Sequence, residues 1–239
     1  MRKCIYSLVF VVVLASSCRS VDNADLRQFT EAPLFGMVYD SESSPVAGAL
    51  VVFDEEKSAE TDINGRVLFS KVSRGNHSVI ITKEGFEEVM LELDFSNRDQ
   101  VLYSTLISLS NILNNLESSL HTGKITEAKS FMVRASKINP DDIRFRYLNV
   151  VYLMEVKKYS GAFDRIVLLR KEYPYDPYII MTQAKILFYG LKEKKEALGL
   201  LQDFLQSNKN DELKTLMNKM DSEIETGSTI ENGTGESND

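Results

Sequence analysis

The chain has 239 residues, with 28 basic and 35 acidic side chains and a net charge of −7 at pH 7. This acidic balance lacks the dense positive charge of a nucleic-acid-binding protein, so we expect no nucleic-acid partner. Both cysteines, Cys4 and Cys18, lie at the start of the chain. The rest of the chain therefore has no disulfide, no cysteine nucleophile and no cysteine metal site.

The first eighteen residues are typical of a bacterial export signal. Arg2 and Lys3 give a positive start, the apolar run 5–15 follows, and Ser16 and Ser17 lead into Cys18. The run is too short to span a bilayer, which takes about 20 apolar residues. The segment resembles the lipobox of bacterial lipoproteins, although its leucine stands four residues before the cysteine instead of three. An ordinary cleaved signal with a chance cysteine is the alternative.

The lipobox resemblance implies that residues 1–17 are removed and that Cys18 becomes a lipidated N-terminus, with acyl chains such as palmitate. We then expect a lipid anchor in the bacterial cell envelope, joined to the first domain by the polar tether 18–33. Arg19 follows the cysteine, where aspartate would favour inner-membrane retention in some bacteria. Its presence slightly favours the outer membrane.

The region 34–108 has the pattern of a small β-sheet domain. Short β-branched or aromatic segments alternate with turn signals such as Asn64-Gly65, which we expect to form a tight hairpin. We name six strands and expect about seven in all, which predicts a β-sandwich. The six strands are Leu34–Asp40, Ala49–Asp54, Arg66–Phe69, Ser78–Thr82, 89–95 and 101–107.

This region resembles the carboxypeptidase regulatory-like domain, a transthyretin-like seven-stranded sandwich. The segments that carry the resemblance are 35–40, 45–51, 61–69, 75–79 and 85–86. The resemblance implies an accessory module without catalytic residues of its own.

From residue 109 the apolar spacing changes to three and four, which predicts helices. Six helices fit the pattern: 109–121, 124–138, 141–156, 159–173, 177–190 and 193–207. The fold class we predict is therefore a small seven-stranded β-sandwich followed by an α-helical hairpin-repeat domain.

The predicted helices recur with a period near 34 residues. Ala128, Ala162 and Ala197 are 34 and 35 residues apart, and Pro140 and Pro174 are 34 apart. This spacing resembles the tetratricopeptide repeat (TPR), in which small alanines let paired helices approach and prolines begin the next helix. The tryptophan and glycine positions of the family's first helix depart from its pattern, so other helical hairpin arrays remain an alternative. The departing residues are Ile112, Arg146 and Met181 for tryptophan, and Leu116, Val150 and Ala184 for glycine.

The TPR-like domain is predicted to span 109–222, and the polar, acidic segment 223–239 to be a disordered tail. Charge is uneven along the chain. There are 8 basic and 16 acidic residues in 19–109, against 18 and 14 in 110–222. We interpret both regions as solvated surfaces.

Candidate chemical sites are few. His77 and His121 lack the partners of a catalytic or metal motif and are expected to be ordinary surface or strand-edge residues. The Asp62-x-Asn64-Gly65 segment resembles the opening of a calcium loop, but Ser73 stands where the loop needs glutamate, so we expect a plain turn. The acidic stretch around Asp54 is expected to be a solvated loop. We predict no cofactor, no metal and no enzymatic activity.

Stacked helix pairs present a concave face formed by their first helices, which commonly holds peptides. By position, the predicted partner-binding residues are Arg144, Asn149, Tyr152, Gln183 and Lys185. The sequence thus favours a membrane-anchored, non-catalytic protein-interaction scaffold. The alternative is a polysaccharide-binding or structural surface lipoprotein that uses the β-sandwich.

Overall fold

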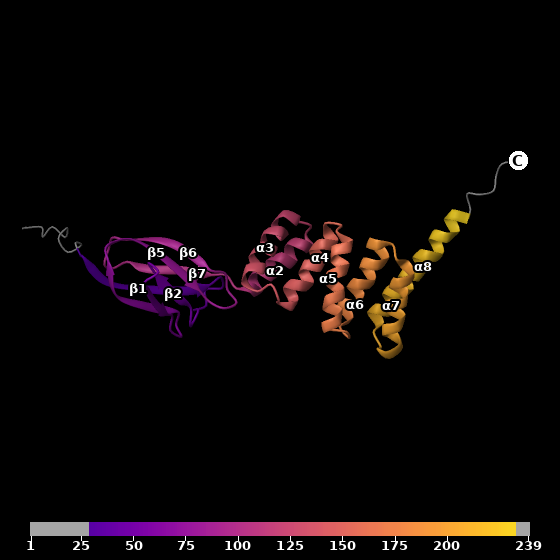
Figure 1. Cartoon of the computed structure of the whole chain (residues 1–239), viewed down its shortest axis with the longest axis horizontal. Coiled ribbons are helices and arrows are strands. Elements are labelled where there is room, and N and C mark those ends of the chain that lie inside the picture. The colour runs from indigo at the N-terminus through magenta and orange to yellow at the C-terminus, as the bar shows by residue number, and fades with distance from the viewer. Residues whose placement is uncertain (1–28, 233–239) are drawn as a thin grey trace, which may run out of the picture. The chain divides into compact units, whose positions relative to one another are not determined.

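The computed structural model describes residues 29–232, with the backbone alone for 227–232. These residues form seven strands followed by seven helices (Figure 1). Contacts divide the chain into two compact units. The first runs through Tyr39 and includes Ser43–Ile81 and Val89–Thr105, and the second takes Asp40–Glu42, Thr82–Glu88 and everything from Leu106 onward. The predicted signal 1–17, Cys18 and the tether up to residue 28 lie outside the described residues.

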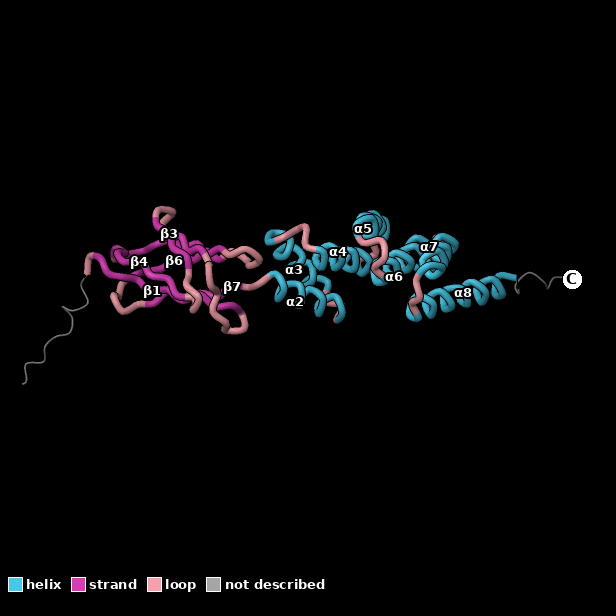
Figure 2. The backbone as a smooth tube through the Cα atoms, turned by 90° about the horizontal axis from the view of Figure 1, so that it is seen from below, coloured by secondary structure: helices cyan, strands magenta, loops and turns pink. Residues whose placement is uncertain are grey.

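The strands form two sheets with the orders β4-β1-β7 and β3-β2-β5-β6 (Figure 2). Inward and outward residues alternate along β1, where Leu34 and Val38 are fully buried and Phe35 is exposed. Such alternation places one face of a sheet on a core and the other in solvent. The first unit is therefore β-sandwich-like. The strands are β1 Glu31–Asp40, β2 Leu50–Phe53, β3 Lys57–Glu60, β4 Arg66–Ser73, β5 Gly75–Thr82, β6 Val89–Phe95 and β7 Val101–Leu106.

The six named strands are confirmed, and one further strand, β3, was not predicted from the sequence. β3 pairs with β2 alone at the edge of its sheet, and none of its residues is fully buried. An edge strand without a buried face carries no alternating apolar signal, so its sequence, Lys-Ser-Ala-Glu, gave no basis for predicting it.

The predicted hairpin at Asn64-Gly65 is wrong, because this turn connects two different sheets. It joins β3 of the four-stranded sheet to β4, which pairs with β1. Gly65 has φ of +71°, and a Cβ atom there would lie 2.4 Å from the carbonyl oxygen of Val38. Only glycine accommodates that approach without displacing β1. The plain turn expected in place of a calcium loop is present, with the Asp62 carboxylate accepting from the amides of Asn64 and Arg66 at 2.8 Å.

His77 is buried, which corrects the prediction of an exposed histidine. Its ring lies 4.8 Å from the Phe53 ring, its Nε2 is 2.8 Å from the carbonyl oxygen of Ser73, and its Nδ1 is 2.6 Å from the Asp54 carboxylate. Burial alone would raise the pKa of Asp54. The hydrogen bonds from His77 and the Ser78 amide, together with nearby positive charge, outweigh it and hold that pKa below its usual range. Asp54 therefore belongs to a built hydrogen-bond network of the sandwich.

The helices of the second unit each contact the next along the chain. Side-chain oxygens cap several of them: Ser108, Asp142 and Asp176 accept from amides of the first turns of α2, α4 and α6. Pro140 and Pro174 lie two residues before two of these caps, whereas Pro177 occupies the first turn of α6. The helices are α2 Leu109–His121, α3 Ile125–Ile138, α4 Ile143–Glu155, α5 Tyr159–Glu172, α6 Pro177–Lys185, α7 Lys194–Ser207 and α8 Asp211–Asn232.

The six predicted helices are confirmed, with one change of geometry in the fifth. The predicted helix 177–190 is α6 continued by a π-helical segment, Ile186–Leu191. Gly190 in this segment packs against Tyr159, since an added Cβ would lie 2.5 Å from the Tyr159 ring. The wider π turn and the glycine together admit this ring beside the helix.

The last helix, α8, was not predicted and extends into the segment 223–239 that was expected to be disordered. Leu213 and Met220 are fully buried and Ile224 is partly buried against the core that α8 shares with α6 and α7. Their spacing of seven and four residues places them on one helix face. Because polar residues separate these apolar positions, the sequence pattern did not predict the helix. The tail beyond residue 232 lies outside the described residues.

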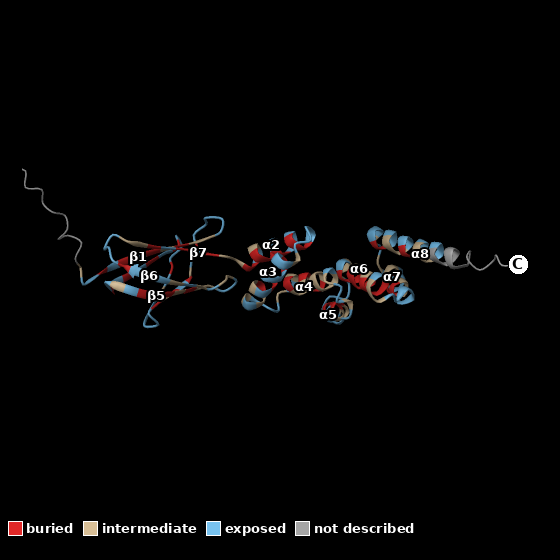
Figure 3. Cartoon of the chain, turned by 90° about the horizontal axis from the view of Figure 1, so that it is seen from above, coloured by how far each residue is buried: buried red, intermediate tan, exposed pale blue. Residues whose placement is uncertain are grey.

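Buried residues run through each helix pair (Figure 3). The three repeated alanines, Ala128, Ala162 and Ala197, are fully buried in three successive core clusters. In the described residues, no buried side-chain nitrogen or oxygen lacks a hydrogen-bond partner.

A charged pair holds the Thr82–Glu88 segment to α3 within the second unit. Arg134 donates to Glu87 through Nε at 2.9 Å and Nη2 at 2.7 Å, and both side chains are about 30% exposed. The hydrogen bonds from Arg134 lower the pKa of Glu87 and outweigh the opposing effect of burial. A carboxylate with a lowered folded pKa stabilises the fold above its unfolded pKa, and the contribution is lost as pH falls through the folded value.

We predict that Glu87→Gln destabilises the second unit by about 1 kcal/mol at neutral pH. The difference from wild type should shrink as the pH falls below about 4.3, the usual pKa of glutamate, because wild type then loses the same charge. Chemical unfolding of both proteins across this range measures it. A difference that is constant with pH would contradict a role for the Glu87 charge.

Candidate functional site

The five predicted partner-binding residues do not share one face. Arg144 and Asn149 are five positions apart on α4, which places them about 140° apart around the helix axis. Arg144 donates to Asn114 at 2.8 Å and to Glu117 at 2.6 Å, both on α2. Gln183 is buried and accepts a hydrogen bond from Arg170 at 3.4 Å, so its side chain is not open to a partner.

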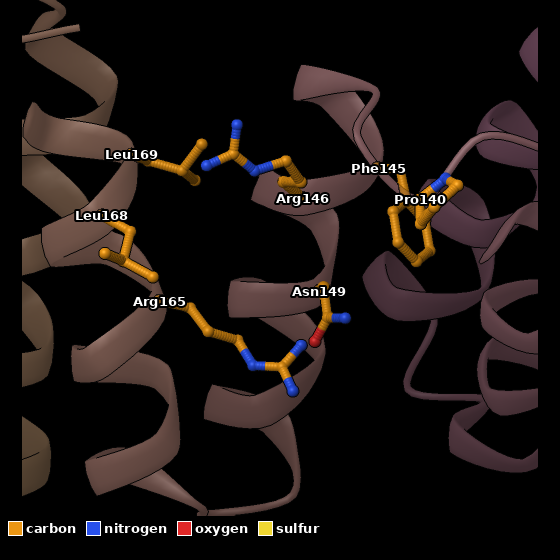
Figure 4. Close-up of a pocket in the computed structure, with 7 residues that line it drawn as sticks. All are labelled: Pro140, Phe145, Arg146, Asn149, Arg165, Leu168 and Leu169. Atoms are coloured by element: carbon orange, nitrogen blue, oxygen red, sulfur yellow. The ribbon is translucent and has the colours of Figure 1, made fainter. Parts of the chain in front are cut away.

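Tyr152 and Lys185 are half-buried, and Tyr152 packs against the first helical core. Of the five predicted residues, only Asn149 lines the pocket that lies between α4 and α5. This pocket has a volume of about 130 Å³. It is lined by Pro140, Phe145, Arg146, Asn149, Arg165, Leu168 and Leu169 (Figure 4).

One wall of the pocket is fixed by an ion pair. Arg146 on α4 donates to Glu172 at the end of α5 through both Nη atoms, at 2.7 and 2.5 Å. These hydrogen bonds raise the pKa of Arg146 and lower that of Glu172, in both cases against the opposing effect of burial. The bidentate geometry holds the guanidinium plane in place.

The opposite wall of the pocket carries Arg165, which no ion pair holds among the described residues. Figure 4 shows the Arg165 guanidinium extending from α5 toward Asn149 of α4. In the part of the chain that the structure describes, no hydrogen bond or ion pair engages either side chain. Arg165 is exposed and Asn149 is half-exposed, so both present their polar groups to solvent in the pocket.

Large apolar side chains are exposed beside the pocket and after it along the chain. Leu168, a lining residue, is 53% exposed. Tyr173, Tyr175 and Tyr178 follow α5 and begin α6, and Tyr175 is 76% exposed. Exposed aromatic residues together with arginine are typical of protein interfaces.

The sequence reasoning missed Arg146, Arg165 and Leu168. Arg165 and Leu168 lie on the second helix of a pair, whereas only first helices were expected to bind a partner. Arg146 lies on the first helix α4 but was not among the residues predicted there. Arg165 was recognisable as a charged residue between the apolar positions Ala162 and Ile166, but the sequence did not show that Asn149 faces it.

The first unit carries a separate exposed surface on its three-stranded sheet. Phe35 of β1 lies directly opposite Leu68 of β4 in the register, and both are about half-exposed. Tyr103 of β7, on the other side of β1, is 65% exposed. Phe53 of β2, in contrast, is buried.

Within residues 29–232, no group of histidine, cysteine, aspartate or glutamate side chains is arranged to hold a metal ion. No helix among the described residues combines the length and apolar character needed to cross a bilayer.

Comparison with known proteins gives only distant structural similarities. No family model matches the chain, and no curated protein matches it. The Bacillus anthracis TIE protein is 15% identical with a TM-score of 0.30, over 33% of this chain and 17% of that one. Wild-type catechol 1,2-dioxygenase of Acinetobacter radioresistens is 10% identical with a TM-score of 0.26, over 36% and 55%.

A cohesin–X-dockerin complex from Acetivibrio cellulolyticus is 20% identical with a TM-score of 0.29, over 35% of this chain and 70% of that one. The chain spans less than two thirds of the TIE protein and of the dioxygenase. At these TM-scores the similarities assign neither an activity nor a partner to this chain.

Proposed function

We propose that the chain is a lipoprotein anchored to the bacterial cell envelope through Cys18, and that its helical unit is a non-catalytic scaffold for a protein partner. The strand unit, resembling the carboxypeptidase regulatory-like domain, serves as spacer or docking module. The lipid raises the effective concentration of the bound partner at the membrane. The lipobox resemblance supports the anchor, with the outer membrane slightly favoured.

The backbone of the helical unit supports a TPR-like repeat. Gly123, Lys157 and Lys192 have φ values of 70°, 59° and 66°. These left-handed residues are 34 and 35 positions apart, the same spacing as the buried alanines. Each lies in the turn between the two helices of a pair, so the helical hairpin recurs in conformation as well as in sequence.

The observation that carries the scaffold proposal is the surface of α5 and α6. It exposes Leu168, which lines the pocket together with the unengaged Arg165, and three tyrosines that follow along the chain. A protein partner that binds this surface would bury these apolar side chains. Such a surface binds protein without any chemistry of its own.

In-cell crosslinking followed by mass spectrometry tests this proposal. We expect a specific protein joined to the helical unit, with crosslinks mapping within 109–222. Crosslinks confined to 34–108, or none to protein, would contradict it. Either would favour the alternative of a polysaccharide-binding or structural lipoprotein, for which the Phe35, Leu68 and Tyr103 face is the available surface.

A further inference from the structure

We propose that the pocket between α4 and α5 binds the carboxylate of an acidic side chain on the protein partner, with an apolar side chain of the same segment against Leu168. This inference rests on the proposed scaffold function and specifies the chemistry of its ligand.

Arg165 is the charge that would hold the carboxylate. Its guanidinium lies in the pocket, exposed and without an ion-pair or hydrogen-bond partner among residues 29–232. A guanidinium offers a planar fork of donors that matches a carboxylate in two parallel hydrogen bonds. In Figure 4 Arg165 points toward the amide oxygen of Asn149 on the facing helix, and such an oxygen can only accept a hydrogen bond.

The other charges around the pocket do not compete for the ligand. The Glu172 carboxylate is already held by Arg146 in a bidentate pair, so it does not pair with Arg165 in place of a ligand. The Asp142 side chain accepts from the Phe145 amide and occupies the first turn of α4. Of the two charged residues that line the pocket, Arg165 is therefore the one without a partner in the part of the chain that the structure describes.

The lining of the pocket favours a carboxylate over a phosphate. A volume of about 130 Å³ has room for a short side chain, and the lining contains no lysine. Phosphate sites normally gather several cationic or backbone donors, whereas a single guanidinium can hold a carboxylate in two parallel hydrogen bonds. The region 110–222 has 18 basic and 14 acidic residues, which favours an acidic partner segment.

The apolar lining defines the second half of the ligand. Leu168, Pro140 and the buried Phe145 are among the apolar residues that line the pocket. An apolar side chain next to the acidic one would cover Leu168 and exclude water from the Arg165 hydrogen bonds, which strengthens them.

Selection of random linear peptides displayed on phage against the full chain tests the inference. We expect the selected peptides to share an aspartate or glutamate beside an apolar residue. Replacing that acid by its amide, or Arg165 by Glu, should weaken binding about tenfold or more. Arg165→Lys should lose part of the binding, because lysine keeps the charge without the planar fork. Binding should also weaken with added salt.

Lys129→Glu is the matched control, since Lys129 is an exposed base on α3 that does not line the pocket. It makes the same reversal of charge in the same unit and should leave binding unchanged. Peptides that bind wild type and Arg165→Glu equally would overturn the pocket inference and leave the scaffold proposal standing. A selection that yields no binding peptide would overturn both.

Discussion

Ala162→Leu is expected to lower the free energy of unfolding of the helical unit by about 1–3 kcal/mol. Ala162 is fully buried on α5 in a core with Val150, Ile166 and Leu169. A core at native packing density has no room for three extra carbon atoms, so neighbouring side chains must leave their preferred rotamers. Urea unfolding followed by far-ultraviolet circular dichroism measures the loss.

Gly161→Ala, one position earlier, is the matched control. Its added Cβ meets only Leu153 Cδ1, at 3.9 Å, which is an ordinary van der Waals contact. Because alanine restricts the unfolded chain more than glycine does, this variant should be as stable as wild type or gain up to about 1 kcal/mol. Equal stability of Ala162→Leu and wild type would show that Ala162 is not at a close helix contact.

Cys18→Ala is expected to abolish membrane anchoring. If Cys18 carries several acyl chains, their burial contributes about 0.8 kcal/mol per CH₂, and all of it is lost with the sulfur that begins the modification. Wild-type protein should partition into the detergent phase in a Triton X-114 extraction, and the variant should stay in the aqueous phase. Cys18 lies outside the described residues, so the prediction rests on the sequence.

Cys4→Ala is the control for this experiment. Cys4 lies inside the predicted signal, ahead of the predicted cleavage point, so the lipobox interpretation implies that it is removed before the mature chain forms. The variant should partition like wild type. A Cys18→Ala protein that still enters the detergent phase would contradict the lipobox interpretation.

The elements that the sequence predicted share a strong periodic signal. β1 alternates buried and exposed residues, and α2 repeats apolar residues at three and four positions, because each packs one face on a core. β3 and α8 were not predicted from the sequence, and each omission has a physical reason. β3 has no buried face and therefore no alternating apolar pattern. In α8 many polar residues separate the apolar positions, so the helical spacing is weak. A π-helical turn at 186–191 has no signature in the sequence.

The candidate site was less predictable than the fold because it depends on how two helices face each other. Asn149 was predicted and lines the pocket, but its neighbour Arg165 comes from the second helix of the pair. Gln183 was assigned to an open face and is buried. An error of one position in helix phase moves a side chain by about 100°, which is enough to exchange surface for core.

Membrane recovery of the crosslinked partner, compared between wild-type and Cys18→Ala cells, shows whether this chain holds its partner at the membrane. We expect the partner still to crosslink to the helical unit of the variant but no longer to be recovered with membranes. Equal recovery of the partner with membranes from both strains would show that this chain does not hold it there, and would contradict the scaffold.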